Sequence, residues 1–575
     1  MTVVNDTSPD VATGTSGNGT SGNGTSTVHR PFYTMRQRIL RGYGPVAAIV
    51  LVLVLVAVLV PSKAGKSNNV AASGEAGGPS AQGGTEGAAG GPAAPGAATQ
   101  TGAAAKAGTA GKTVTLPGKT TACTNQALQV PGDPYSPPCL LFSGDNGGAT
   151  SKGVTGDTIT VAVRLTTDQS FQQTLAQLAG AQLRDTNEDN VRTIQAMAKY
   201  FNSHFNFFGR KIAIKTYTGQ GSLSNELQGN GQAAAQADAV TVGKQTNAFA
   251  DITAESEPYA TALQHQGVMG FGDPYMPGYW HQNHAPYDWS LATDGTDLAT
   301  DVANYAVQKL CPPGTPAKLA GGNLKNAPRK FAGIAPSNEL YQVSVDVFKK
   351  IMEAHGCPVD SYSYTLDLGT ESQQAQNLVQ KLKSQGYTTI LCGCDPIFPV
   401  YLSGQEYSQG YIPEFVEIGA ALVDQDYVGQ LYNQVAFAHA FGISPNLATV
   451  PYTQTIGYKA YKTVEPASEP AFFVDIIYSQ MDMLAIGLQM AGPNLTPKSY
   501  EKGMFTFPPK LGPAGLWGWD PGQYTIPNDF REVCWSPSTV SPNNSKQGAY
   551  LETSKTRWTQ NSIPKGPPGC PIPSG

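Results

Sequence analysis

The chain has 575 residues, and its 37 lysines and arginines against 42 aspartates and glutamates give a net charge of −5. This length exceeds what one hydrophobic core supports, so several domains are expected. The mild acidity and the lack of a lysine- or arginine-rich stripe exclude nucleic acid as an expected partner.

The first 120 residues are dominated by Gly, Ala, Ser and Thr, apart from one apolar block. Residues 1–42 contain a repeated SGNGT, show no periodicity, and are predicted to be a disordered, cytoplasmic N-terminus. Residues 61–120 are predicted to be a flexible Gly/Ala-rich linker.

The apolar block at residues 43–60 is predicted to be an uncleaved transmembrane helix, a signal anchor. About 18 residues at 1.5 Å each span roughly 27 Å, which is enough to cross a bilayer core. Arginines crowd the preceding segment, so the positive-inside rule keeps the N-terminus in the cytoplasm and places the rest outside the cell membrane. A cleaved signal peptide is the alternative, because Ser62-Lys63-Ala64 loosely fits a cleavage site.

All eight cysteines follow the apolar block, and their even number predicts disulfides in an oxidising compartment. Residues 121–154 form a Cys/Pro-rich extension, in which we expect Cys123–Cys139 to close a loop. A second pair is expected between Cys311 and Cys357, at equivalent ends of neighbouring helices.

A first alternation of strands and helices follows the extension and predicts a parallel sheet. Strands are expected at Thr158–Leu165, Lys211–Tyr217, Ala248–Thr253 and Val268–Phe271, and helices at Asn190–Phe201, Gly231–Gln245 and Glu257–Gln266.

A second alternation of strands and helices begins at Lys330–Ala335 and is interpreted in the same way as the first. Its first helix carries an apolar face from Val343 to Met352 and ends near Gly356, as helices often do at glycine. Further strands are expected at Ser361–Thr365, Thr388–Cys392 and Phe415–Ile418, with helices at Ala375–Leu382, Tyr401–Gln409 and Ala471–Ala491. Two more strands are expected around Leu516–Trp519 and Phe530–Trp535.

These elements resemble the type I periplasmic binding proteins, in particular the branched-chain amino acid (Leu/Ile/Val) branch of ABC transporter substrate-binding proteins. The residues that carry the resemblance are GVTGDTITVAV (Gly153–Val163), Val191–Ile214, Glu339–Gly356, KLKSQGYTTILCGCDP (Lys381–Pro396) and Gly515–Trp535.

The resemblance implies an α/β fold of two Rossmann-like lobes joined by three crossovers, with a hinge between them. Lobe I would comprise residues 155–295 and about 430–512, and lobe II residues 296–429 and about 513–575. The crossovers would lie near Leu291–Asp297, Ala420–Tyr432 and Pro509–Leu516. Ligands of open parallel sheets bind beyond the carboxyl ends of the strands, which places a cleft between the lobes.

The resemblance also implies ligand-binding residues at the turns after the strands. These are Ser256, Asp273, Tyr275, Asp294, Tyr341 and Asp395. Gly419-Ala420 stand where the family has an acidic residue that binds an ammonium group, and Glu255 would repel a carboxylate. The cleft is therefore expected to be more aromatic and more polar than an amino acid site.

Several short motifs invite other interpretations. Gly229–Ala234 matches a dinucleotide loop but lacks a strand immediately before it, so a helix-entry loop is preferred. Asp185–Asp189 resembles the start of a calcium loop but lacks its glycine and glutamate, so helix capping is preferred. His281 and His284 are read as part of a solvated loop rather than a zinc site. Cys392 and Cys394 are expected in separate disulfides, one of them with Cys534, with a redox pair as the alternative.

The sequence thus predicts a membrane-tethered, extracytoplasmic solute-binding protein that captures a small polar or amphipathic ligand, of the amino acid or amide class, for an ABC-type importer. A ligand-sensing or scaffold ectodomain without a transporter is the alternative. No hydrolase, zincin or P-loop motif is present, so neither an enzyme nor a cofactor or metal is predicted.

Overall fold

The computed structural model describes residues 119–166, 168, 170, 173–174, 185–272, 275–312, 315–526, 529–554 and 556–573. All of them belong to one structural unit, Thr99–Gly575. The predicted cytoplasmic N-terminus, transmembrane helix 43–60 and nearly all of the linker lie outside the described residues. Within the described part, no helix has the length and hydropathy that a membrane crossing requires.

The first lobe is built on a parallel sheet with the strand order β4-β3-β5-β6-β7. Its strands are β3 (Thr158–Leu165), β4 (Lys211–Thr218), β5 (Ala250–Asp251), β6 (Met269–Phe271) and β7 (Asp288–Trp289). The helices that follow them are α3 (Asn187–His204), α4 (Leu223–Leu227), α5 (Gln232–Val240), α6 (Glu257–His265) and α7 (Gly278–Asn283).

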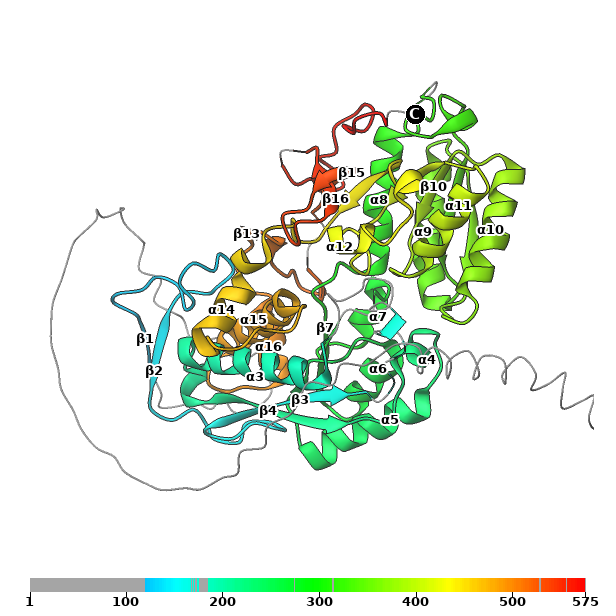
Figure 1. Cartoon of the computed structure of the whole chain (residues 1–575). Helices are drawn as coiled ribbons and strands as arrows, with labels where there is room; N and C mark the ends of the chain where they lie inside the picture. Colours follow the sequence, from blue (N-terminus) through cyan, green and yellow to red (C-terminus); the bar gives the residue numbers. More distant parts are fainter. Residues whose placement is uncertain are drawn as a thin grey trace, which may run out of the picture. The chain divides into compact units, whose positions relative to one another are not determined.

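Three helices from later in the chain complete the first lobe: α14 (Ile456–Val464), α15 (Val474–Met490) and α16 (Pro497–Met504). Helices α14 and α15 pack against α3 beside β3 and β4 (Figure 1). Met481, Leu484 and Leu488 of α15 share one core with Phe201 of α3 and Val161 of β3. The other face of the sheet packs through Ala162 on α5 and α6.

The second lobe is built on a mixed sheet with the order β16-β15-β12-β11-β10-β8-β9. Its strands are β8 (Phe331–Pro336), β9 (Val359–Tyr364), β10 (Thr389–Cys392), β11 (Glu414–Glu417), β12 (Ala440–Ser444), β15 (Arg531–Val540) and β16 (Gln547–Glu552). Strands β15 and β16 run antiparallel to their neighbours, and the rest are parallel.

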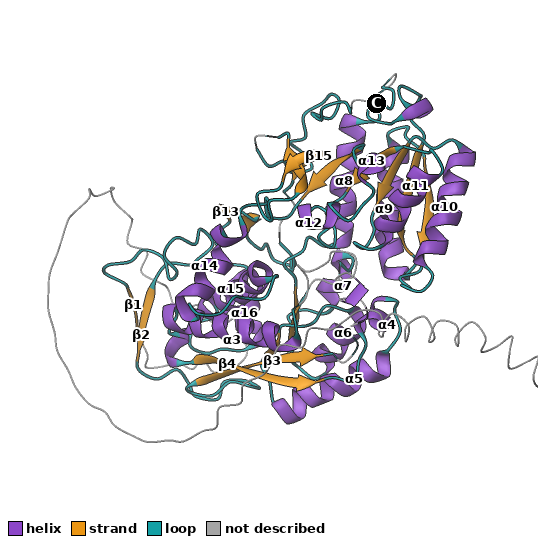
Figure 2. Ribbon diagram, viewed as in Figure 1, coloured by secondary structure: helices purple, strands orange, loops and turns teal. Residues whose placement is uncertain are grey.

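Helices cover both faces of this sheet (Figure 2). They are α8 (Gly295–Lys309), α9 (Glu339–Ala354), α10 (Glu371–Gln385), α11 (Phe398–Ser408), α12 (Asp426–Gly429) and α13 (Gln434–Phe437). Successive residues point to opposite faces: Leu391 joins the core under α8 and α9, while Ile390 and Cys392 join the core under α10 and α11.

Smaller elements lie outside the two main sheets. β1 (Lys119–Ala122) pairs with β2 (Leu140–Ser143), and β13 (Lys510–Gly512) pairs with β14 (Gly515–Trp517). Short 3-10 turns occur at η2 (Phe207–Gly209), η4 (Gly322–Leu324) and η5 (Tyr452–Gln454), and a π-helical segment, η3 (Thr241–Thr246), continues α5.

The lobe boundaries differ from the sequence expectation at two crossovers. The first crossover joins β7 to α8, as expected. The second lies after Ser444 rather than near Ala420–Tyr432, because β12 pairs with β11 in the second sheet. This strand is buried on both faces, so it lacks the alternation by which half-buried strands are recognised.

The third crossover lies after Ile526 rather than near Pro509–Leu516. Trp517, Trp519 and Ile526 belong to the core of the first lobe, whereas Phe530 belongs to the second. Tyr135 of the N-terminal extension stacks on Trp517 with ring centroids 4.1 Å apart. The apolar area of these rings therefore holds residues 513–526 on the first lobe.

Four disulfides are formed among the described residues. Cys123–Cys139 and Cys311–Cys357 agree with expectation. Cys392 pairs with Cys394, and Cys534 with Cys570, so the expected separate pairing of Cys392 and Cys394 is wrong. The Cα atoms of Cys392 and Cys394 lie 5.2 Å apart, within the usual range for a disulfide.

Two of the ambiguous motifs are structural. Thr186 caps α3 and forms a capping box with Asp189, which confirms the capping interpretation. Gly231 is the N-cap of α5, as expected for a helix-entry loop. His281 and His284 are buried rather than solvated: His281 pairs with Asp288, and His284 bonds Thr261 at 2.9 Å.

A buried acid on α8 makes folding depend on pH. Asp301 is 1% exposed, and its Oδ1 atom has no hydrogen-bond partner among the described residues. Burial, followed by the charges of Asp297 and Asp294, raises the pKa of Asp301 to about 9. A raised pKa means that the folded state holds this proton more tightly than the unfolded state. The stabilisation that this bound proton gives the folded state is therefore complete below about pH 4, and it is lost as the pH rises toward the pKa of Asp301 in the folded state.

We expect Asp301→Asn to become progressively more stable than the wild type as the pH rises from about 5 to 8, by up to about 1.4 kcal/mol per pH unit. Denaturant unfolding across this range measures the difference. Asp346→Asn, at an exposed position on α9, is the control and should show no such trend. A difference independent of pH would show that Asp301 is already ionised in the folded protein.

Candidate functional site

A cavity of about 630 Å³ lies between the two lobes and is lined by both. Residues at the carboxyl ends of three parallel strands reach it: 163–166 from β3, 333–336 from β8, and 391 and 393–396 from β10 and its following turn. Parallel sheets leave their strand-end turns free to contact a ligand at this edge, so the fold itself creates the cleft. The volume is in the range of small-molecule sites.

Apolar side chains make up most of the wall. The first lobe contributes Val163, Leu165, Val191, Ile194, Leu223, Leu227 and Ile252, and α15 contributes Ile476 and Ile477. The second lobe contributes Leu298, Val302, Val345, Phe348, Leu366, Leu368, Leu391 and Ile418. A ligand that fills this space must bury a substantial apolar body.

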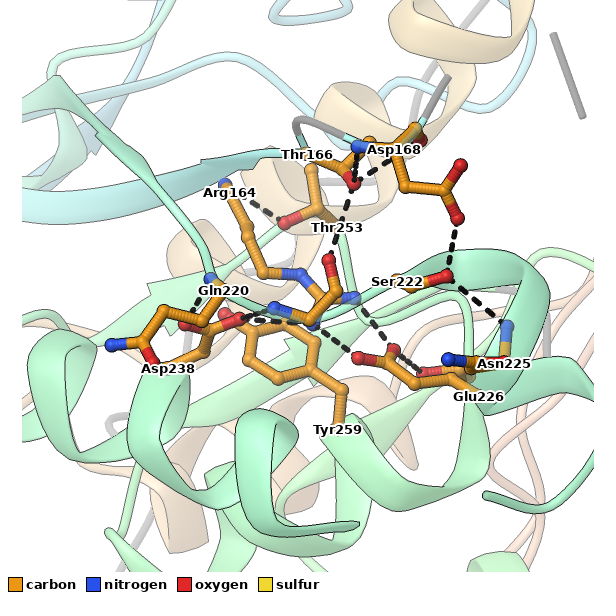
Figure 3. Close-up of polar contacts among 12 residues, drawn as sticks. Arg164, Thr166, Asp168, Gln220, Ser222, Asn225, Glu226, Asp238, Thr253 and Tyr259 are labelled. Carbon is orange, nitrogen blue, oxygen red and sulfur yellow. Dashed lines mark hydrogen bonds and ion pairs between the residues drawn. The ribbon is translucent and has the colours of Figure 1, made fainter. Parts of the chain in front are cut away.

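Arg164, at the end of β3, is the one basic side chain among the described lining residues. Its guanidinium makes two hydrogen bonds to Glu226, at 2.8 and 2.9 Å, and lies 3.4 Å from Asp238 (Figure 3). It also lies 3.7 Å from the centre of the Tyr259 ring. Burial would lower the pKa of Arg164, but its hydrogen bonds and charge interaction with Glu226 raise it overall. The Arg164 guanidinium is therefore already paired with two carboxylates, those of Glu226 and Asp238.

This charged cluster also fixes neighbouring loops of the first lobe. The backbone N–H groups of Gln220 and Gly221 donate to Asp238 at 2.8 and 2.9 Å, and Ser222 donates to Asp168 (Figure 3). The cluster thus ties the end of β3 to the segment after β4. Its polar groups are mutually satisfied, which favours a structural role.

Two carboxyl groups form an acidic end of the cavity in the second lobe. Asp395 follows β10: its Oδ1 atom accepts from the N–H groups of Ile397 and Phe398, and its Oδ2 atom accepts from the Tyr364 hydroxyl at 2.6 Å. Burial raises the pKa of Asp395. Glu371, the first residue of α10, also borders the cavity.

Glu371 is buried, and its Oε2 atom has no partner among the described residues. Burial, followed by the charges of Asp395 and Asp367, raises the pKa of Glu371 to about 9. This carboxyl group is therefore protonated near neutral pH while the cleft is empty.

Of the residues expected from sequence to bind ligand, Tyr275, Tyr341 and Asp395 line the cavity. Tyr275 accepts a hydrogen bond from the Ala421 N–H at 2.9 Å and so connects the two lobes. Asp273 lies outside the described residues.

Ser256 and Asp294 are placed elsewhere. The Ser256 hydroxyl donates to Glu226 at 2.5 Å, within the cluster around Arg164. Asp294 is the N-cap of α8 and accepts from the N–H groups of Thr296 and Asp297. Neither borders the cavity, because local hydrogen bonds at a helix start hold Asp294 and a buried carboxylate holds Ser256.

Sequence reasoning missed Arg164 and Glu371 as cleft residues. A glutamate in the first turn of a helix is common because its negative charge interacts favourably with the helix dipole. The position of Glu371 in the sequence therefore did not mark it as a ligand-binding residue. Leu366 and Leu368, on the loop just before Glu371, line the cavity together with it. The Cys392–Cys394 disulfide also reaches the cleft, through Cys394.

A smaller cavity, of about 180 Å³, lies beside the crossovers. Segments 291–292 and 445–450 and Ile526, from the three crossovers, border it, together with the aromatic side chains of Tyr427, Tyr452 and Phe472. It shares Tyr275, Leu422, Phe473 and Ile476 with the main cavity.

Solved structures with the same arrangement support this description. A solute-binding protein of an ABC transporter from Rhodopseudomonas palustris HaA2, in complex with p-hydroxybenzoic acid, aligns with a TM-score of 0.50 and 14% identity over 70% of this chain and 98% of that chain. A solute-binding protein from R. palustris in complex with 4-hydroxybenzoate aligns with the same score and identity, over 71% of this chain and 100% of that chain. This chain has the type I periplasmic binding protein fold.

The resemblance expected from sequence is therefore confirmed at the level of the fold. No family model and no curated protein matches the sequence. The cavity described here lies between the two lobes, which the three crossovers connect.

Proposed function

We propose that this chain is an extracytoplasmic solute-binding protein that captures a small amphipathic ligand between its lobes. The cavity supports this proposal most directly, because its wall is shared between two lobes that three crossovers connect. Closure of the lobes around a ligand would be a hinge motion. The four disulfides fit an oxidising compartment outside the cytoplasm.

The chemistry of the wall favours an apolar ligand body over a simple amino acid. Apolar side chains predominate, and Arg164 is already paired with Glu226 and Asp238. A ligand carboxylate, such as that of the hydroxybenzoates in the two neighbours, would have to compete with two buried carboxylates for this cation. Delivery to an ABC-type importer and tethering by residues 43–60 complete the proposal.

The proposal predicts that filling the cavity abolishes binding. Val345 on α9 borders the cavity, whereas Val343, two residues earlier and similarly half-buried, does not. We expect Val345→Trp to remove the rise in melting temperature that octanol, a neutral amphipathic probe, gives with the full-length protein, because a ligand that binds only the folded state stabilises it. Val343→Trp should keep the rise. Loss of the rise with both variants, or with neither, would contradict the assignment of the cleft.

A further inference from the structure

We propose that the cleft selects ligands that carry a cationic amine on an apolar body, and that Glu371 and Asp395 receive the amine. This inference rests on the proposed solute-binding function and specifies its ligand. It assigns binding to Glu371, a residue for which the sequence motifs indicate no role.

The first observation is the unsatisfied state of Glu371. Its side chain is 1% exposed, borders the cavity, and leaves Oε2 without a hydrogen-bond partner among the described residues. Buried polar atoms are nearly always satisfied, since an unpaired one costs about 1–3 kcal/mol. Glu226, a buried glutamate of the first lobe, has the guanidinium of Arg164 as its partner. An amine from the ligand would give Glu371 a cationic hydrogen-bond donor, as Arg164 does for Glu226.

The second observation is the charge of the wall. Asp185, Glu371 and Asp395 line the cavity, against Arg164 alone among the basic residues described there. Arg164 is held within 2.8 Å of Glu226 and 3.4 Å of Asp238, so it adds no net positive charge to the cleft. In a site of low effective dielectric constant these acids favour a cation over a carboxylate, because a bound cation stabilises their ionised form and a ligand carboxylate opposes it.

The third observation is the rigidity of Asp395. The backbone N–H groups that open α11 and the Tyr364 hydroxyl hold both carboxyl oxygens in place. A carboxylate has about four lone-pair positions, so three such bonds leave capacity for one more donor. An ammonium group has three N–H donors and can bond Glu371 and Asp395 together.

The position of the amine explains the apolar remainder of the cavity. Leu366 and Leu368 border the cavity on the loop just before Glu371, and Leu391 borders it on β10, just before Asp395. A ligand anchored at the acidic end therefore extends along aliphatic walls toward the first lobe. The ligand class is an aliphatic or aralkyl amine.

Binding of a cation would also move a proton. Near neutral pH, Glu371 is protonated in the empty cleft because burial, Asp395 and Asp367 raise its pKa to about 9. The groups around it are these two acids and the neutral Tyr364 hydroxyl, and no described basic side chain perturbs it. A bound ammonium favours the charged carboxylate, so binding should release the proton of Glu371.

The experiment compares octylamine, octanol and octanoate, which share chain length and differ in charge, on the full-length protein by titration calorimetry. We expect octylamine to bind at least about tenfold more tightly than octanol, and octanoate to bind most weakly. In Glu371→Gln the affinity for octylamine should fall by about tenfold or more, with that for octanol unchanged within about twofold. Glu339→Gln, an exposed glutamate that likewise opens a helix of the second lobe, is the matched control and should change neither affinity.

A second readout separates ligand contact from a structural role. Titrations near pH 7 in two buffers of different protonation enthalpy should show release of close to one proton per octylamine in the wild type, and none in Glu371→Gln. A merely structural Glu371 would weaken octylamine and octanol equally and leave proton release unchanged, which would overturn the inference.

The remaining outcomes distinguish this inference from the proposed function. Octanoate binding as tightly as octylamine, with Val345→Trp abolishing both, would leave the solute-binding function standing and overturn the preference for a cation. Failure of all three probes to bind the wild type would count against the apolar cleft and the inference together.

Discussion

Replacing Arg164 with methionine is expected to lower the free energy of unfolding by about 3–5 kcal/mol, because it leaves buried carboxylates without their cation. Glu226 and Asp238 are 1% and 2% exposed, and both contact the guanidinium. The variant also loses the contact of the guanidinium with the Tyr259 ring. Denaturant unfolding of the ligand-free protein measures the change.

Two further variants test this explanation. Arg192→Met removes a half-exposed arginine that pairs with Asp189 within α3, and should cost about 1 kcal/mol or less. Adding Glu226→Gln to Arg164→Met should recover part of the loss, because it removes one of the unpaired charges. Equal costs for Arg164→Met and Arg192→Met would show that the buried cluster is not held by its charges.

Replacing Trp289 with alanine is expected to cost about 3–5 kcal/mol, the range for deleting a large buried aromatic side chain. Trp289 ends β7, immediately before the first crossover, and is fully buried. Its ring contacts Tyr500 and Tyr524 edge-to-face, with centroids 5.4 and 5.1 Å away, and its indole N–H donates to the Pro286 carbonyl at 3.0 Å.

Trp289→Phe should cost less than Trp289→Ala, since it keeps an aromatic ring in the same pocket. Thermal or denaturant unfolding of both variants gives the comparison. Because Tyr500 and Tyr524 come from the last part of the first lobe, the result also measures how strongly the late segment of the chain holds the first crossover. A loss below about 1 kcal/mol for Trp289→Ala would mean that the surrounding rings close over the gap.

The sequence predicted strands and helices correctly where the pattern that marks them is local. The strand at 158–165 and the helix ending near Gly356 follow from alternation, helical spacing and a C-terminal glycine with φ of +77°. Strand β12 was missed because a short strand buried on both faces has no period to recognise. The bounds of helix α8 were not predicted, because its second turn carries Asp301, whose burial the sequence does not reveal.

The candidate site was predicted less completely than the fold. Tyr341 and Asp395 reach the cavity because they follow strands of the second sheet, which the order of the elements anticipates. Ser256 and Asp294 do not, because hydrogen bonds to a buried glutamate and to a helix start compete for them. Such competition depends on neighbours that are distant in the sequence.

The sequence by itself determined the two-lobed α/β architecture, since strand and helix periods and the glycines that end helices are properties of adjacent residues. It also favoured the Cys123–Cys139 disulfide, which closes a loop of the N-terminal extension. Only the tertiary structure decided where the lobes divide, which cation is already neutralised, and that Glu371 is buried at the cleft without a partner. The reason is physical: burial and charge pairing are set by side chains brought together from distant segments, and these set both the pKa of an acid and its availability to a ligand.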